Sequence, residues 1–365
     1  MVHFFVHPKK YQTSRYEPNA FDYINEEGIL VLQQFIDEKI MKNLAKQLNL
    51  AIEGLESPTK DRIRDFILST RGKQLRPALI AVTTKLLTQD SDLQENAMAR
   101  SNNFAISIEL LHNMTLIHDD LIDGAPLRRG KDAFHKIHGA DRALHDGDVL
   151  HAYALTLLKD DPAGLKLVLD YAYQVGLGNA IELEDRLDQN FSFDIDRVIK
   201  IMEYKTAVVF AGCVRLGCLA ANRDDLFSEK LNKSIIAAGI AFQIQDDYLD
   251  ILGNPEEFGK TQFWDIQESK RNLFLYFALK TDFAPRIKEI YNKDIGEKDQ
   301  DDIKTILEAF GSIQDRVKEV RDQYSKLAID GLMELQSEVD DEDYVAEELL
   351  DFLLILTKYL IERKK

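Results

Sequence analysis

The 365-residue sequence predicts an all-α protein with a single helical domain. Apolar residues recur at helical spacing from about residue 27 onward, and the apolar–polar alternation that is typical of strands is nowhere sustained. No internal repeat is evident beyond two acidic motifs. The clearest breaks between the predicted helices lie at 160–164, 253–259, 292–302 and 338–343.

The N-terminal part of the chain differs from the rest. Residues 1–25 are rich in Tyr, Phe, His and Asn and lack periodicity, so we expect an irregular extension before a helical domain over 26–365. The first helix is predicted over 27–55. A break at Pro58 follows, and the second helix is expected to begin near Thr59.

The composition is that of an ordinary globular protein, with 45% hydrophobic and 30% charged residues. A net charge of −17 argues against nucleic acid as a partner, because its phosphates would be repelled. An anionic substrate must therefore be held by local positive charge and metal.

No signal peptide is recognisable, and no apolar run approaches the roughly 18 residues that span a bilayer. We expect a cytoplasmic protein without a membrane span, in which Cys213 and Cys218 are small core residues.

The first acidic motif contains Asp119 and Asp123 at the end of an apolar run. On a helix these positions lie one turn apart on the same face, so their carboxylates repel each other unless a cation lies between them. Mg²⁺ suits such a site because it prefers oxygen ligands and takes several of them from water and substrate phosphates. Arg128 and Arg129 follow, and guanidinium groups match phosphate oxygens. The stretch therefore indicates a diphosphate site.

The second acidic motif repeats the pattern with Asp246 and Asp250, again inside an apolar segment where charge is costly. Either motif alone is equally well explained as a solvated helix face, but two such motifs favour a functional site.

Lys73 and Arg76 lie three residues apart and could present two cations to one anion. Taken alone, a solvated basic turn is the simpler interpretation of these two cations.

At these residues the chain resembles the trans-isoprenyl diphosphate synthases, the polyprenyl synthetase family that includes geranylgeranyl and farnesyl diphosphate synthases. The acidic motifs match the two DDxxD motifs of that family in order and rough separation, and the resemblance extends from about Gly72 to the C-terminus. It implies an orthogonal helical bundle of the isoprenoid synthase type around a central cavity, and a homodimer. It also implies that Mg²⁺, as three ions with bound diphosphate, is held by Asp119, Asp123, Asp246 and Asp250.

The resemblance further implies roles for cationic and polar side chains. Isopentenyl diphosphate is expected to be held by Lys73, Arg76, His112 and Arg129. For His112, a satisfied core histidine is the competing interpretation. Arg128 is expected to face the allylic diphosphate, and the other substrate-binding residues are expected to be Lys205, Thr206, Gln243, Lys260 and Lys270. The expected catalytic residues, which neutralise charge on the leaving diphosphate, are Lys205, Lys260 and Arg128.

The implied reaction joins isopentenyl diphosphate to an allylic diphosphate, which is dimethylallyl, geranyl or farnesyl diphosphate. Short-product relatives carry an aromatic residue four or five positions before the first motif, where this chain has Thr115 and Met114. The floor of the product tunnel is therefore expected deeper, near Leu111 and Ile108, and the expected product is geranylgeranyl diphosphate (C20). A C15 or C25 product is the alternative, as is a plain core role for these side chains.

Two other functions stay open. One is a catalytically silent or regulatory subunit of a hetero-oligomeric prenyl synthase, although such a subunit has no reason to keep all four motif aspartates. The other is a terpene cyclase on the same fold, which would not need the cations for a second substrate. The positions that depart from the family pattern are Arg71, Gln74, Asn179, Glu182 and Trp264.

Overall fold

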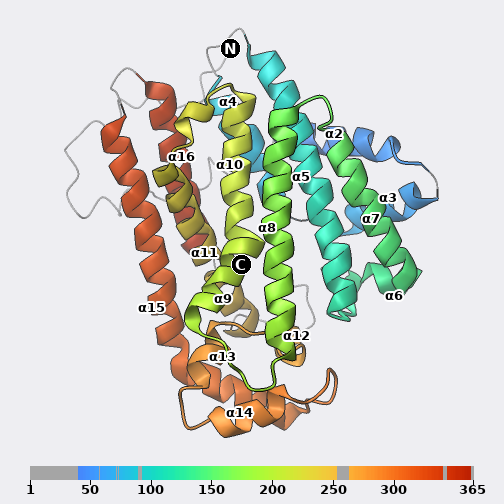
Figure 1. Ribbon diagram of the computed structural model, residues 1–365, viewed down its shortest axis with the longest axis vertical. Helices are drawn as coiled ribbons and strands as arrows, with labels where there is room; N and C mark the ends of the chain where they lie inside the picture. Colours follow the sequence, from blue (N-terminus) through green and yellow to red (C-terminus); the bar gives the residue numbers. More distant parts are fainter. Residues whose placement is uncertain are drawn as a thin grey trace.

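The computed structural model describes residues 40–56, 58–70, 72, 74–88, 93–252, 263–339 and 343–362. These residues fold almost entirely into helices, so the predicted all-α fold class is confirmed (Figure 1). The predicted extension over 1–25 and the predicted break at 253–259 lie outside the described residues. No helix in the described part of the chain is long and apolar enough to cross a membrane.

The helices follow one another with short connections. In the N-terminal half the elements are α2 (Met41–Glu53), α3 (Thr59–Ser69), α4 (Leu75–Leu86), α5 (Gln94–Ile122), β1 (Leu127–Arg128), β2 (Lys131–Asp132), α6 (Phe134–His138), α7 (Ala140–Thr156) and α8 (Pro162–Leu187). In the C-terminal half they are α9 (Ile195–Met202), the π-helical turn η4 (Glu203–Ala207), α10 (Val208–Ala220), η5 (Asp224–Leu226), α11 (Glu229–Leu252), α12 (Trp264–Gln267), α13 (Leu273–Ala278), α14 (Ala284–Tyr291), α15 (Gln300–Glu338) and α16 (Tyr344–Glu362).

Two long helices begin at predicted breaks because each carries a strong N-terminal signal. Asp161 caps α8 by accepting a hydrogen bond from a backbone N–H of the first turn, and Pro162 occupies the first helical position. At α15, Asp299 and Asp302 form a capping box. The Asp302 carboxylate is fully buried and also accepts hydrogen bonds from two basic side chains of the preceding segment. The break before α15 is therefore fixed by both backbone and side-chain contacts.

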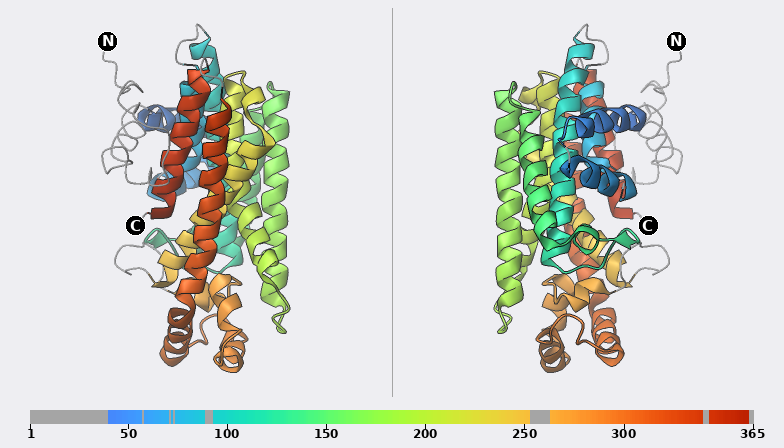
Figure 2. Two further views of the ribbon diagram at one scale, coloured as in Figure 1. Left: turned by 90° about the vertical axis from the view of Figure 1, so that its left-hand side faces the viewer. Right: turned by 90° about the vertical axis from the view of Figure 1, so that its right-hand side faces the viewer.

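The core consists of two main clusters of buried apolar side chains. The larger cluster joins α2, α3, α4, α5, α7, α10 and α16, and it contains Cys213 and Cys218, as predicted. Burial raises the pKa of both thiols to about 12. The smaller cluster joins α9, α11, α13, α14 and α15 around the rings of Phe274 and Phe310, whose centroids lie 5.3 Å apart. Figure 2 shows α15 running down the face seen in its left view and α8 at one outer edge of the bundle in both views.

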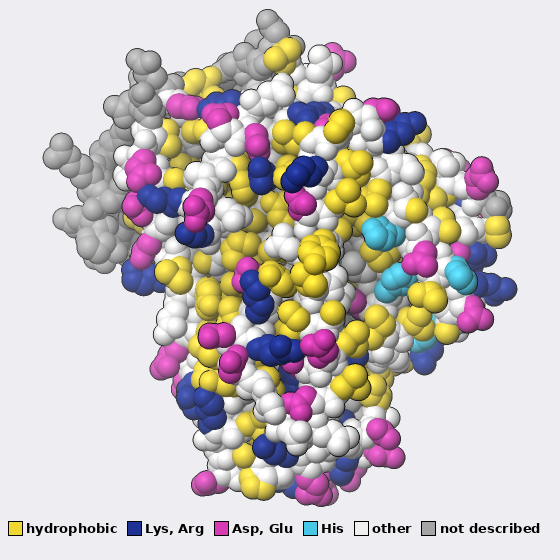
Figure 3. Space-filling model, viewed as in Figure 1, with side chains coloured by type: hydrophobic (Ala, Val, Ile, Leu, Met, Phe, Trp, Pro, Cys, Tyr) yellow, Lys and Arg dark blue, Asp and Glu magenta, His cyan; other side chains and the backbone are white. Residues whose placement is uncertain are grey.

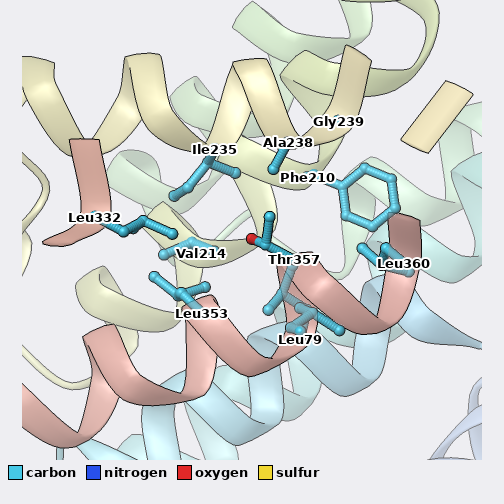
Figure 4. A pocket seen from close by; sticks show the side chains of 11 residues that line it. Leu79, Phe210, Val214, Ile235, Ala238, Gly239, Leu332, Leu353, Thr357 and Leu360 are labelled. Carbon is cyan, nitrogen blue, oxygen red and sulfur yellow. The ribbon is translucent and has the colours of Figure 1, made fainter. Parts of the chain in front are cut away.

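A small apolar pocket lies between α4, α10, α11, α15 and α16 (Figure 4). Leu79, Phe210 and Leu353 are among its lining residues, and Thr357 is the polar side chain among them. No residue of the acidic motifs lines this pocket. A cavity with such a lining does not suit a charged group.

Two glycines allow η4 to lie close to both α8 and α11. A Cβ atom on Gly178 of α8 would lie 2.9 Å from the Cγ atom of Lys205, and a Cβ atom on Gly239 of α11 would lie 2.6 Å from the Cα atom of Ala207. Both distances are shorter than van der Waals contact, so no larger residue fits without a shift of η4. This packing fixes the position of the segment that carries Lys205 and Thr206.

We predict that Gly239→Ala lowers the free energy of unfolding by about 1–3 kcal/mol, because the added methyl group overpacks the contact with the backbone of Ala207. Gly311→Ala on α15 is the matched control, because a Cβ atom there meets no atom of the described chain within 4 Å. This control should raise stability by up to about 1 kcal/mol through its higher helix propensity. Urea unfolding measures both changes, and equal stability of the two variants would contradict the tight packing of η4.

Candidate active site

The first acidic motif lies at the C-terminal end of α5. Burial raises the pKa of Asp119, and the neighbouring carboxylates of Asp123 and Glu182 raise it further, while Lys205 and Lys270 oppose this rise. Two carboxylates of one helix therefore meet a third from α8 together with two lysines. The predicted proximity of Asp119 and Asp123 on one helical face agrees with this arrangement.

The central residue of the motif, Asp120, has a different role from its neighbours. Its side chain is fully buried and accepts a hydrogen bond from Nε of Arg128 at 3.0 Å. Arg128 belongs to β1, and the turn to β2 is made by Arg129 and Gly130, which both have positive φ angles of 52° and 74°. The ion pair thus anchors the hairpin that follows the motif, and it holds the Arg128 guanidinium beside Asp119 and Asp123, with which it interacts electrostatically.

A basic cluster lies beside this hairpin. Nη1 of Arg76 lies 3.3 Å from Nε2 of His112. Burial lowers the pKa of His112 well below its usual range, and the nearby Arg76, Arg129 and Arg128 lower it further. His112 is therefore a neutral imidazole at physiological pH, in contact with the half-buried cation of Arg76.

The turn before α4 packs against the same hairpin. Arg129 donates a hydrogen bond to the backbone carbonyl of Thr70, and its guanidinium covers Gly72 so closely that a Cβ atom there would lie 2.1 Å from Nη1. On the other side, the Nε2 atom of Gln74 donates to the buried carboxylate of Glu109 at 3.3 Å. The structure thus brings Arg76, His112 and Arg129 together as predicted, whereas Lys73 lies outside the described residues.

Lys205 and Thr206 lie in η4, and π-helical turns of this kind are frequent at functional sites. Lys205 donates to the carboxylate of Glu182. The hydroxyl of Thr206 donates to Oε1 of Gln243 at 2.8 Å, and Nε2 of Gln243 donates to Oδ1 of Asp247 at 2.8 Å. This chain of hydrogen bonds connects η4 directly to the second acidic motif on α11.

Lys270 connects the two acidic motifs electrostatically. Its ammonium lies 3.6 Å from Asp265, and this carboxylate is the main reason why the pKa of Lys270 is raised well above its usual value. Lys270 also interacts with Asp119 in the first motif and with Asp247 in the second. Burial raises the pKa of Asp247 to about 7. The residues predicted from two distant stretches therefore converge around one lysine, while the predicted Lys260 lies outside the described residues.

The second motif completes the set of acidic groups. Asp246 and Asp250 are half-buried on α11, and Asp246 interacts electrostatically with Arg76 of the basic cluster. Within the described residues, no three acidic, histidine or cysteine side chains lie close enough to hold a metal ion without other ligands. The paired carboxylates of each motif nevertheless fit Mg²⁺. This ion typically uses one or two carboxylates and completes its coordination shell with water and phosphate.

The predicted chain-length residues lie on the same helix, before the first motif. Leu111 is buried in the larger core cluster, and Met114 is half-buried and packs against it. The hydroxyl of Thr115 donates to the carbonyl of His112 at 2.8 Å, within the helix itself. The role of these three positions in product length stays a prediction.

Sequence reasoning missed several residues that contact the site. Arg186 donates to Asp123, Glu268 lies 4.0 Å from Arg186, and burial raises the pKa of Glu268 to about 8. For Arg186 a signal was present, because it follows Glu182 by one helical turn and so shares its face of α8. For Glu268 and Glu109 the sequence alone contained no signal that distinguishes them from other acidic residues.

Comparisons with known proteins converge on one family. A family model described as polyprenyl synthetase matches residues 58–310. A geranylfarnesyl diphosphate synthase from Aeropyrum pernix is 27% identical over 322 residues, which cover 85% of this chain and 96% of the relative. A geranylgeranyl diphosphate synthase from Saccharolobus solfataricus is 29% identical over 314 residues, which cover 82% of this chain and 89% of the relative. A solved polyprenyl synthase from Caulobacter crescentus, complexed with calcium and isoprenyl diphosphate, matches with a TM-score of 0.76 and 26% identity over 91% of this chain and 97% of that one.

Proposed function

Because the chain belongs to the polyprenyl synthetase family and is therefore a trans-prenyltransferase, we propose that it condenses isopentenyl diphosphate with an allylic diphosphate to give geranylgeranyl diphosphate. The observation that supports this proposal most directly is the position of Lys270, which interacts with Asp119 and with Asp247. A single diphosphate site needs the two motifs to converge in this way.

Asp119, Asp123, Asp246 and Asp250 are the residues proposed to hold Mg²⁺, as three ions in the presence of diphosphate. Bound Mg²⁺ would supply charge neutralisation to the leaving diphosphate. The chain itself contributes fixed cations for the same purpose, which are Lys205, Arg128 and Lys260. Lys205 is held by Glu182 and Arg128 by Asp120, so neither has to reorganise when charge develops. Such preorganised groups are usually the largest contribution to catalysis.

Isopentenyl diphosphate is proposed to bind at the basic cluster, where Lys73, Arg76, His112 and Arg129 would hold its diphosphate. Its double bond would attack the allylic carbon as the bond from that carbon to the diphosphate oxygen breaks. One proton then leaves the new carbon chain, and the departing diphosphate can accept it, so the mechanism requires no side-chain base. The longer allylic diphosphate that results can react again until its tail fills the tunnel.

The product length is proposed to be C20. Met114, Thr115 and Leu111 on α5 offer no aromatic floor near the first motif, which supports a product longer than C15. The named relatives include both a geranylgeranyl and a geranylfarnesyl diphosphate synthase, so the C25 product is the principal alternative.

A homodimer is proposed to form through α7 and α8. Exposed large apolar side chains gather on these two helices, namely Leu144 and Val149 on α7 and Leu169, Tyr173 and Leu187 on α8. Figure 3 shows hydrophobic side chains over the middle of the face on which α8 lies. Exposed apolar patches of this kind often mark interfaces between proteins.

The reaction is tested with radiolabelled isopentenyl diphosphate, an allylic primer and Mg²⁺. We expect elongated products, no product in the presence of a chelator, and a rate lower by roughly 10²–10³ in Asp246→Asn. Asp315→Asn is the control, because this exposed carboxylate of α15 pairs only loosely with Lys318 at 3.3 Å. Failure to elongate dimethylallyl, geranyl and farnesyl diphosphate alike would refute the proposed activity.

Met114→Phe should shorten the main product, because an aromatic ring one turn before the first motif would raise the floor of the tunnel. Met98→Phe is the matched control, since Met98 lies on the same helix and also packs against the larger core cluster, but farther from the motif. Products are separated by chain length. A product distribution that is the same in Met114→Phe and wild type would show that Met114 does not line the tunnel.

The double variant Leu169→Glu, Tyr173→Glu should dissociate the dimer, because it places two charges in an apolar interface. Sedimentation equilibrium would show twice the chain mass for wild type and the chain mass for the variant. Leu327→Glu, an exposed apolar residue of α15, serves as the control and should stay dimeric. A wild-type protein that sediments as a monomer would exclude the proposed assembly.

A further inference from the structure

Arg186 lies at the end of α8 and contacts a residue of the first acidic motif. Its Nη1 atom donates to Oδ1 of Asp123 at 2.8 Å and lies 4.0 Å from Oε2 of Glu268. The side chains of Arg186 and Asp123 are 16% and 27% exposed, and that of Glu268 is 3% exposed. A partly buried guanidinium between two carboxylates has little freedom to rotate, so it can fix the orientation of Asp123.

The backbone that carries Arg186 is itself held in place. Arg271 donates to the carbonyl of Asp185 at 3.1 Å and to the carbonyl of Asp188 at 3.2 Å, and its guanidinium lies 4.3 Å from the centre of the Phe191 ring. These contacts hold carbonyl groups at the C-terminal end of α8, where regular helical hydrogen bonding stops. The end of α8 is therefore a rigid support for the Arg186 side chain.

Arg186 also continues a regular arrangement of charges between α8 and α5. One turn earlier on α8, Glu182 accepts a hydrogen bond from Lys205, and both interact electrostatically with Asp119. Each aspartate of the first motif thus has a cation close to it, Lys205 for Asp119 and Arg186 for Asp123. The two cations differ in geometry, because Arg186 bonds directly to one carboxylate oxygen of its aspartate.

We propose that Arg186 is a positioning residue that holds Oδ1 of Asp123, so that Oδ2 is oriented to bind a divalent cation. This inference rests on the metal site of the proposed function. Carboxylates that bind metals are commonly hydrogen-bonded by a second protein group, and the loss of that group typically weakens metal binding about 10–100-fold. If the guanidinium instead competed with the metal for the Asp123 carboxylate, its removal would make metal binding tighter.

The test is a titration with Mn²⁺ at a fixed concentration of inorganic diphosphate, followed by electron paramagnetic resonance, on wild type, Arg186→Gln and Arg186→Lys. We expect the dissociation constant for Mn²⁺ to rise about 10–100-fold in Arg186→Gln and by less in Arg186→Lys, which keeps the charge but not the planar fork. In the same variants the Mg²⁺ concentration that gives half-maximal rate should rise, while kcat at saturating Mg²⁺ is largely kept.

Arg197→Gln is the matched control, because it removes a positive charge near the same end of α8. Arg197 bonds to Asp185 and Glu184 rather than to the motif, so this variant should bind Mn²⁺ like wild type. Thermal unfolding shows which variants are folded, and Arg186→Lys decides the question if Arg186→Gln does not fold.

Binding of Mn²⁺ that is unchanged or tighter in the Arg186 variants overturns the inference and leaves the proposed function intact. Equal weakening in Arg197→Gln also overturns it, because the effect would then be one of net charge. A wild-type protein that binds no Mn²⁺ overturns the metal site itself, and the inference with it.

Discussion

The compensation of buried carboxylates by a few fixed cations is the constraint on which the site depends. Burial raises the pKa of Asp119 and of Asp247, which lie on different helices, and Lys270 opposes the rise at both. Without this lysine the acidic groups would bind protons or force the helices apart. Charge balance therefore favours the approach of α5 and α11 at one place, and that place is where we propose that a diphosphate and its cations bind.

The position of η4 in the site depends on small residues. Gly178 and Gly239 let the π-helical turn η4 lie against α8 and α11 at distances that leave no room for a Cβ atom unless η4 shifts. The same turn presents Lys205 to Glu182 and Thr206 to Gln243. Packing and chemistry are thus coupled, because a shift of η4 would break a hydrogen bond on each side of it.

Sequence patterns predicted the parts of the site that have a local signal. Aspartates four residues apart on an apolar helix indicated a cation site, and the caps at Asp161 and Asp299 lay at predicted breaks. Contacts between distant stretches had no such signal. The hydrogen bond from Gln243 to Asp247 is local, but the bond from Thr206 to Gln243 depends on how η4 packs against α11. Arg186 was missed although it shares a helical face with Glu182, because its hydrogen bond to Asp123 depends on how the helices pack.

The strong negative charge of the chain does not prevent it from binding the proposed anionic substrates, because charge repulsion and side-chain contacts act over different distances. A net charge of −17 repels an approaching diphosphate, but screening at physiological ionic strength limits that repulsion to about 8 Å. Within that range the proposed substrate would meet cations that are already held by other groups, Arg128 by Asp120 and Arg129 by the carbonyl of Thr70. Because folding has already restricted these side chains, little conformational entropy is lost on binding. In the proposed complex, short-range contacts with a small number of fixed cations would therefore outweigh the charge of the whole molecule.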